Sequence, residues 1–241
     1  MHVCTSAIVL NKVKYNDTTF ISTLYTRELG SVSFAVRIPK TSKANIKPTL
    51  FQPLNLVQAE WDHKPATNLQ RLQNLNIEHP YSTLLYNPRK AVIATFLAET
   101  IYHSTKQEEQ GDLYPFIAAS LLWFDKAEKN FLNFHIVFLI KLICQLGFQP
   151  NTDNPFGYRY FDLQDAEYTA TQPFHNYYLR HGDAHHLPFF TELNYTNMWR
   201  AKLSPATQAR ILRIITTYYK LHISGFPNLR STEIINELLA D

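Results

Sequence analysis

The densest group of potential metal ligands in the sequence is the run His181-Gly182-Asp183-Ala184-His185-His186. Imidazole and carboxylate groups this close together can hold zinc or another transition metal. The surrounding segment is polar and irregular, so no helical or strand pattern fixes the geometry of these ligands. A histidine-rich surface loop is therefore the main interpretation, and a metal-dependent hydrolase that uses His181–His186 is the alternative.

A second set of residues has the chemistry to bind a polyanion. Residues 1–64 contain eight Lys/Arg and four Asp/Glu, a net charge of +4, whereas the remaining residues carry fifteen against sixteen, a net of −1. Such an asymmetry favours a nucleic-acid partner for the N-terminal quarter, although charge alone supports a solvated surface equally well. The candidate DNA-binding cations are Lys12, Lys14, Arg27, Arg37, Lys40, Lys43 and Lys47.

Aromatic residues interleave with these cations and could stack on bases. Tyr15 and Tyr25 are the better candidates, whereas we expect Phe20 and Phe34 to belong to the core. Their alternation with lysine and arginine is typical of a surface on which cations contact the phosphates and aromatic rings stack on the bases.

Motifs of common catalytic sites are absent from the sequence. The six glycines are widely separated, which excludes a glycine-rich phosphate-binding loop. Neither GxSxG nor HExxH occurs. The pairs Glu108/Glu109 and Asp162/Asp165 lie in polar stretches and are interpreted as solvated charges. The sequence therefore predicts a protein that is not an enzyme and needs no cofactor.

The stretch Phe131–Phe148 is apolar at almost every position and predicts a helix buried on several sides. Gly147 suits the left-handed position after its end, and Pro150 prevents continuation. His135 within it is expected to be a core histidine. Polar residues interrupt the stretch, which is also too short for a membrane span. The two cysteines form no CxxC pair, and no secretory signal pattern is present, so we expect a cytoplasmic protein.

Two kinds of periodicity divide the chain. Alternating apolar residues predict strands at 5–13, 18–26, 31–38 and 54–61, with a strand or short helix at 69–77 and a basic loop at 39–48. Short strands around such a loop suggest a small Greek-key barrel. From Asn87 the apolar spacing becomes helical, with helices expected at 88–106, from Asp112 as the N-cap to 129, at 205–222 behind the N-cap Ser204, and from Ser231. The boundary is expected near residues 78–88, with an irregular insert at about 151–195 and a short strand pair within 158–169.

Several motifs, in the same order along the chain, resemble the bacterial RecO family of DNA repair proteins. They are Ala7-Ile8-Val9-Leu10, Tyr15, Gly30, Ala35-Val36-Arg37, Leu50-Phe51-Gln52-Pro53, Ala91–Thr100 with Glu109, Leu146-Gly147-Phe148-Gln149-Pro150, and Tyr219, His222 and Leu229-Arg230-Ser231. The resemblance implies an α+β protein with an N-terminal OB-fold β-barrel at residues 1–80 and a helical domain at 81–241. Ala35-Val36-Arg37 differs from the family's A-R-G, so the role of its arginine does not carry over directly.

The resemblance also implies a function. RecO proteins are recombination mediators that bind single- and double-stranded DNA and anneal complementary strands. They engage the acidic C-terminal tail of single-stranded DNA-binding protein (SSB) and the partner RecR, and help load RecA. The implied location is the cytoplasm, with association to the nucleoid. Many members carry four zinc-binding cysteines after L-G-Y/F-x-P, but residues 151–158 contain none. We therefore expect no structural metal.

A receptor for an acidic tail that ends in an apolar residue needs an apolar pocket rimmed by cations. Two cationic stripes in the helical part are candidates, and the resemblance does not choose between them. One consists of Arg210, Arg213 and Lys220, and the other of Lys126, Lys129 and Lys141. A protein-interaction scaffold without DNA binding is a further alternative for the whole chain, and salt-dependent DNA binding separates it from a mediator.

Overall fold

The computed structural model describes residues 1–37, 46–106, 111–153 and 157–240. The chain forms two compact units. Unit 1 contains Met1–Lys126 together with Leu229–Leu238, and unit 2 contains Ala127–Asn228. The predicted domain boundary at residue 80 separates the strand-rich part of the chain from the helical part, whereas the two units are defined by compactness. That boundary stays a prediction.

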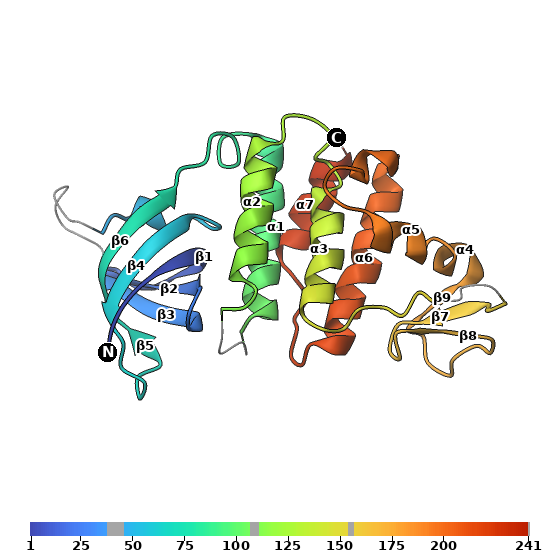
Figure 1. Ribbon diagram of the computed structural model, residues 1–241, viewed down its shortest axis with the longest axis horizontal. Coiled ribbons are helices and arrows are strands. Elements are labelled where there is room, and N and C mark those ends of the chain that lie inside the picture. Colours follow the sequence, from blue (N-terminus) through green and yellow to red (C-terminus); the bar gives the residue numbers. More distant parts are fainter. Residues whose placement is uncertain (38–45, 107–110, 154–156, 241) are drawn as a thin grey trace. The chain divides into compact units, whose positions relative to one another are not determined.

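Unit 1 is built on a six-stranded sheet with the order β5-β3-β2-β1-β4-β6 (Figure 1). Its strands are β1 (His2–Asn16), β2 (Thr19–Thr26), β3 (Gly30–Arg37), β4 (Leu56–Asp62), β5 (Leu69–Gln70) and β6 (Leu72–His79). All neighbouring strands are antiparallel except β3 and β5. The predicted OB-fold barrel is confirmed, and the ambiguous segment 69–77 proves to be strand.

The fifteen-residue β1 organises this sheet. Its first half pairs with β4 and its second half with β2, with a register shift between Val9 and Asn11. Such an irregularity bends a strand and lets it pair with a neighbour on each side of a curled sheet. The enclosed core includes Val9, Phe34 and Trp61, and the rings of Phe34 and Trp61 meet edge to face at 5.1 Å. Gly30 has a φ of +60°, a left-handed conformation that glycine adopts without a steric cost.

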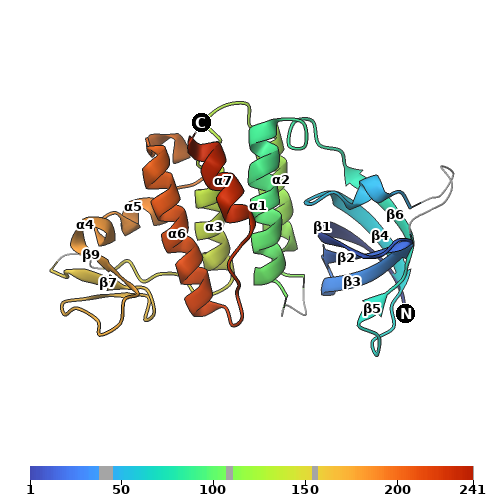
Figure 2. The ribbon, with the colours of Figure 1, turned by 180° about the vertical axis from the view of Figure 1, so that it is seen from behind.

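Three helices complete unit 1: α1 (Pro88–Ser104), α2 (Tyr114–Lys126) and α7 (Ser231–Ala240). The side chain of Asn87 caps α1 and Pro88 occupies its first turn, which explains why the start was predictable. Figure 2 shows α7 next to α1, where the carboxylate of Glu99 accepts hydrogen bonds from the main chain of Arg230 and Ser231. The predicted cap at Asp112 is wrong, because α2 begins two residues after it and ends at Lys126.

Unit 2 contains α3 (Phe134–Gln145), α4 (His181–Ala184), α5 (Leu187–Glu192) and α6 (Pro205–His222), with the 3₁₀ turn η2 (Met198–Arg200). In Figures 1 and 2, α3 and α6 run side by side. The N–H groups of Gly147 and Phe148 donate to the carbonyls of Cys144 and Ile143, which closes α3 with the predicted left-handed glycine. Ser204 caps α6 by accepting from the N–H of Thr207, also as predicted.

The irregular insert of unit 2 folds into a second, three-stranded sheet, so this half of the chain is not purely helical. Its strands are β7 (Tyr160–Asp162), β8 (Glu167–Thr169) and β9 (Tyr178–Arg180), in the order β8-β7-β9. The predicted strand pair corresponds to β7 and β8, whereas β9 was not expected. Among the described residues, no helix is long and apolar enough to cross a membrane.

Candidate functional site

Most of the predicted DNA-binding residues lie at one end of the six-stranded sheet. The hairpin of β1 and β2 carries Lys12, Lys14 and Tyr15 on its exposed end, and Tyr15 is 70% exposed. Arg37 pairs with Thr19 at the same end, because β3 runs antiparallel to β2. Lys47 is exposed and precedes Pro48, the residue that Lys12 contacts. A phosphate backbone that follows this end of the sheet would meet several cations and one exposed aromatic ring.

The two lysines of the hairpin already have partners within the protein. The ammonium of Lys12 donates to the carbonyl of Pro48 at 3.1 Å and lies 4.6 Å from the centroid of the buried Phe20 ring. Lys14 forms an exposed ion pair of 2.8 Å with Asp17. Arg37 and Lys47 form no ion pair within the described part of the chain, which makes them the better candidates for phosphate contacts.

Three predicted DNA-binding residues need comment. Tyr25 is fully buried and its hydroxyl accepts a hydrogen bond from the N–H of Leu113, so the prediction that its ring stacks on bases is wrong. Arg27 is exposed but follows the opposite end of β2 from Arg37, away from the hairpin end. Lys40 and Lys43, with most of the predicted basic loop, lie outside the described residues.

Unit 2 contains an apolar pocket of about 370 Å³. Its walls come from α3, α5, α6 and the small sheet, and include Ile140, Phe161, Leu187, Phe190, Ile211 and Ile215. Ile211 is half-buried and lines this pocket. The charged side chains in the lining are Asp183, Arg200, Lys202 and Arg210, with His186 beside them. The pocket therefore combines apolar walls with an excess of positive charge.

The pocket includes one residue from the two cationic stripes. Arg210 lines it and pairs with Asp183. Arg213 and Lys220 lie exposed on α6 outside the lining, and Lys220 donates to Asn228. Lys126 ends α2, Lys129 follows it in the chain, and Lys141 is half-buried in α3; none of these three lines the pocket.

Sequence reasoning missed Arg200 and Lys202, the other two cations of the pocket. A signal was present, because residues 193–228 contain five Lys/Arg and no Asp or Glu. What the sequence alone did not reveal is that the turn around residue 200 lies against an apolar cavity.

The histidine run forms α4 and the two residues after it. The rings of His181 and His185 lie 5.9 Å apart, and the carboxylate of Asp183 is engaged by Arg210. In the described part of the chain, no group of three or more metal-ligating side chains is suitably arranged. The geometry gives the metal-dependent alternative no support, and the expectation of a metal-free protein stays a prediction.

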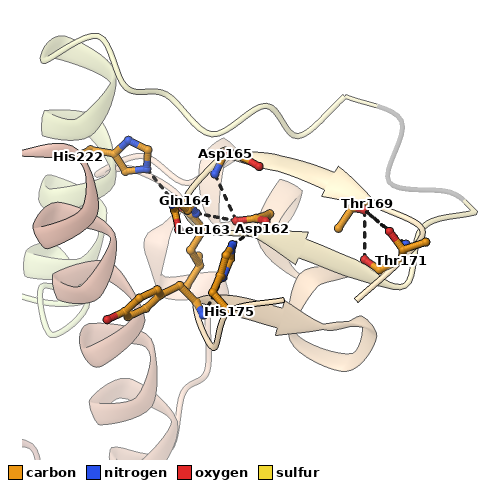
Figure 3. A network of polar contacts seen from close by, with 9 residues as sticks. Asp162, Leu163, Gln164, Asp165, Thr169, Thr171, His175 and His222 are labelled. Atoms are coloured by element: carbon orange, nitrogen blue, oxygen red, sulfur yellow. Dashed lines mark hydrogen bonds and ion pairs between the residues drawn. The ribbon is translucent and has the colours of Figure 1, made fainter. Parts of the chain in front are cut away.

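The predicted solvated charge at Asp162 is wrong, because this residue is buried in the small sheet. One carboxylate oxygen accepts from the N–H groups of Gln164 and Asp165, and the other lies 3.1 Å from the ring of His175 (Figure 3). A ring nitrogen of His222 lies 2.9 Å from the carbonyl oxygen of Leu163. These contacts fix the turn after β7 and one wall of the pocket. Glu108 and Glu109 lie outside the described residues.

His135 is fully buried in α3, as predicted for a core histidine. Burial lowers the pKa of its imidazole to about 4, against a weaker opposing effect of a hydrogen bond to the main chain of Leu132. The side chain is therefore neutral near pH 7.

Comparison with known proteins covers nearly the whole chain. The family described as "Recombination protein O N terminal" matches residues 1–81, and "Recombination protein O C terminal" matches residues 85–233. The chain is 37% identical over 237 residues to "DNA repair protein RecO" of Phocaeicola vulgatus, which covers 98% of each protein. It is 39% identical over 236 residues to the protein of that name from Bacteroides fragilis, covering 97% of this chain and 98% of the relative.

Proposed function

The chain belongs to the RecO family, which makes it a recombination mediator in DNA repair, and we propose that it binds DNA at the hairpin end of its six-stranded sheet. The observation that carries this proposal is that Lys12, Lys14, Arg37 and Lys47 lie at the same end of the sheet as the exposed residue Tyr15. Cations hold a backbone of either single- or double-stranded DNA, and an exposed aromatic ring adds stacking for unpaired bases.

Such a surface supports strand annealing without a catalytic group. Cations screen the repulsion between phosphates, and two strands held on one protein meet at a high effective concentration. Annealing of complementary strands is thus part of the proposed function, and Lys40 and Lys43 extend the cationic set along the chain from Arg37 to Lys47.

A titration of fluorescent single-stranded DNA at two salt concentrations tests this proposal. Reversal of Arg37 and Lys47 to Glu should weaken binding to all sequences alike and should flatten the salt dependence, because each lost phosphate contact on a single strand reduces the logarithmic slope by about 0.7. Arg27→Glu is the matched control, since Arg27 follows the other end of β2. An unchanged dissociation constant in the double variant would show that this end of the sheet is not the DNA site. It would favour the alternative of a protein-interaction scaffold without DNA binding.

The same proposal places the acidic C-terminal tail of SSB in the apolar pocket of unit 2. The support is chemical complementarity: apolar walls suit the final apolar residue, and an excess of cations suits acidic groups and a free carboxylate. Engagement of RecR, help in loading RecA, and a cytoplasmic location associated with the nucleoid are proposed from family membership alone.

Isothermal titration with a tail peptide tests the pocket. Leu203→Asp introduces a charge into the apolar wall and should abolish the heat of binding at micromolar protein, whereas Lys141→Ala, outside the lining, should leave it unchanged. Unfolding in urea checks that the Leu203 variant remains folded. Loss of binding in the Lys141 variant, with retention in the Leu203 variant, would indicate that the tail binds at the stripe of Lys126, Lys129 and Lys141 instead.

A further inference from the structure

We propose that one face of the small sheet in unit 2 is a second binding site for single-stranded nucleic acid. This outer face carries Tyr160 and Tyr178, which would support unpaired bases. Arg159 and Arg180 would hold the phosphates of the same strand. The proposal does not depend on the one for the hairpin end of the six-stranded sheet, because the two sites share no residue.

The strand register gives the small sheet two different faces. Successive side chains of a strand alternate between the faces, and residues paired across neighbouring strands share one face. Phe161 pairs with Leu179 on the inner face, where both are buried and line the apolar pocket. Tyr160 pairs with Arg180 on the outer face, which also carries Tyr178. The two tyrosines are half-buried and the arginine is exposed, so the outer face is available to a ligand.

The larger of two hollows beside the outer face is rich in cations. It has a volume of about 700 Å³, and its lining among the described residues includes Arg159, Arg180 and His181 but no Asp or Glu. Neither arginine forms an ion pair with any residue that the structure describes, and both are exposed. Tyr160 and Gln172 also line this hollow. A phosphate that enters it would therefore meet two uncompensated guanidinium groups.

The smaller hollow, of about 570 Å³, also has Arg180 in its lining. It adds Tyr178 and Asn176, whose side-chain amide can hydrogen-bond to the edge of an unpaired base. The carboxylate of Asp183 lines it too, but this group pairs with Arg210. Because Arg180 belongs to both hollows, a strand that extends from one to the other keeps contact with the same cation.

The acidic residues of the outer face lie away from its cations. Asp162 and Glu167 pair with each other two residues along the strands from Tyr160, a distance of about 7 Å. The carboxylate of Asp162 is already engaged by two main-chain N–H groups and lies against the ring of His175 (Figure 3). Tyr178 lies in this second row, so its contribution is a contact with a base rather than with a phosphate.

The aromatic rings of the small sheet are held by contacts with one another. Tyr160 and Tyr178 meet edge to face with their centroids 5.4 Å apart. Tyr158, which is 39% exposed and lines the larger hollow, stacks on Tyr168, whose hydroxyl donates to the carbonyl of Ala184 at 2.9 Å. Rings held in this way lose little freedom when a ligand binds. A small sheet with such rings suits roughly two or three unpaired bases, whose faces a duplex would keep covered.

The first experiment titrates a fluorescent oligothymidylate of about eight nucleotides with the full-length protein. The protein carries Arg37→Glu and Lys47→Glu, so that the remaining binding reports on sites other than the hairpin end. Additional reversal of Arg159 and Arg180 to Glu should weaken this binding about tenfold. It should also lower the logarithmic salt slope by about 1.4, as the loss of two phosphate contacts on a single strand requires.

Matched variants separate these effects from general electrostatics and from unfolding. Arg213→Glu with Lys220→Glu changes the net charge equally at exposed positions outside both hollows, and should leave the affinity nearly unchanged. Tyr178→Leu keeps an apolar side chain but removes the ring, and should weaken binding roughly tenfold without changing the salt slope. Tyr177→Leu, at an exposed position outside both hollows, is its control. Urea unfolding checks that each variant is folded.

Photocrosslinking locates the strand on the wild-type protein. An oligothymidylate with 5-iododeoxyuridine in place of thymidine reacts with the aromatic rings that its bases contact. Mass spectrometry should find the nucleotide on peptides that contain Tyr158, Tyr160 or Tyr178. Thymidine monophosphate and a polyglutamate of similar length serve as competitors, and neither should displace the labelled strand as effectively as unlabelled oligothymidylate.

Full affinity after reversal of Arg159 and Arg180 would overturn this site, and so would a complete loss of binding on reversal of Arg37 and Lys47 alone. Crosslinks confined to the hairpin end would also overturn it. Equal displacement by polyglutamate would make the face a site for acidic protein segments, and equal displacement by thymidine monophosphate a site for free nucleotides. Failure of the hairpin proposal has a different signature: reversal of Arg37 and Lys47 would then leave wild-type affinity.

Discussion

The buried ammonium group of Lys90 donates a hydrogen bond to the main-chain carbonyl of Asp125 at 2.9 Å, while the carboxylate of Asp125 accepts hydrogen bonds from a different segment of the chain. The same ammonium also bonds to the carbonyl of Phe124 and the hydroxyl of Thr83, both at 2.7 Å. The carboxylate accepts the N–H groups of Ser82, Thr83 and Leu84. Main-chain N–H groups thus satisfy the carboxylate, and two carbonyls with the Thr83 hydroxyl satisfy the ammonium. The two residues join the end of α2, the start of α1 and the segment before α1.

Loss of the ammonium should destabilise unit 1. Lys90→Met removes all three hydrogen bonds and leaves two carbonyls at the end of α2 without this donor, so we expect a cost of roughly 3 kcal/mol in the free energy of unfolding. Lys126→Met is the control: Lys126 is exposed at the end of α2, and the change should stay within about 0.5 kcal/mol. Urea unfolding measures both, and a Lys90 variant as stable as the wild type would contradict this account.

Features set by neighbouring residues were predictable from the sequence. The N-cap Ser204 with Pro205, and the helix end at Gly147, depend on local backbone requirements, and the structure has them at the predicted residues. The alternation in β3 likewise predicted its buried face, because one side of the strand faces the core.

Features set by distant contacts were not predictable in the same way. Tyr25 looks like an exposed aromatic among cations, but it is buried and its hydroxyl accepts the N–H of Leu113, far along the chain. Asp162 looks solvated in the sequence, but it is buried in the small sheet and its carboxylate lies 3.1 Å from the ring of His175. Arg200 lines the pocket from a turn in which the carbonyl of Ala201 accepts a hydrogen bond from Asn133, which lies far back in the chain, just before α3.

Gly111 should tolerate no side chain. An added Cβ would lie 2.0 Å from the carbonyl oxygen of Arg27 and 2.4 Å from that of Thr26, and main-chain atoms cannot rotate away. We expect Gly111→Ala to cost about 3 kcal/mol or more. Gly182→Ala is the matched control, because an added Cβ there meets nothing within 4 Å, and its effect should stay near zero. Equal stability of the two variants would refute the close approach at Gly111.

His135 should make the protein sensitive to mild acid. Its pKa of about 4 in the folded state lies below the ordinary value of about 6.5, so the unfolded chain binds the proton more readily. The stabilising contribution of the neutral ring is present above pH 6.5 and is lost as the pH falls towards 4, by roughly 3 kcal/mol in total. In His135→Phe this part of the pH dependence of the unfolding free energy should disappear, whereas it should persist in the exposed control His185→Gln.

The two tyrosines that the sequence proposed as stacking residues should behave differently. Tyr15 is 70% exposed on the hairpin, so Tyr15→Ala should weaken binding of single-stranded DNA about tenfold, because one stacked base contributes roughly 1–3 kcal/mol. Tyr25→Phe should leave DNA affinity unchanged and lower the free energy of unfolding by about 1 kcal/mol, since the N–H of Leu113 loses its acceptor.

Fluorescence anisotropy with labelled single-stranded DNA and urea unfolding measure the two effects separately. Tyr86→Ala provides the control for Tyr15: it removes an equally exposed ring, 77% accessible, in the segment before α1, where no DNA contact is proposed. Weaker binding in the Tyr86 variant, or full affinity in the Tyr15 variant, would mean that bases do not stack on the hairpin. Because an aromatic contact acts on bases and the cations act on phosphates, Tyr15→Ala should reduce affinity without changing the salt dependence, in contrast to the reversal of Arg37 and Lys47.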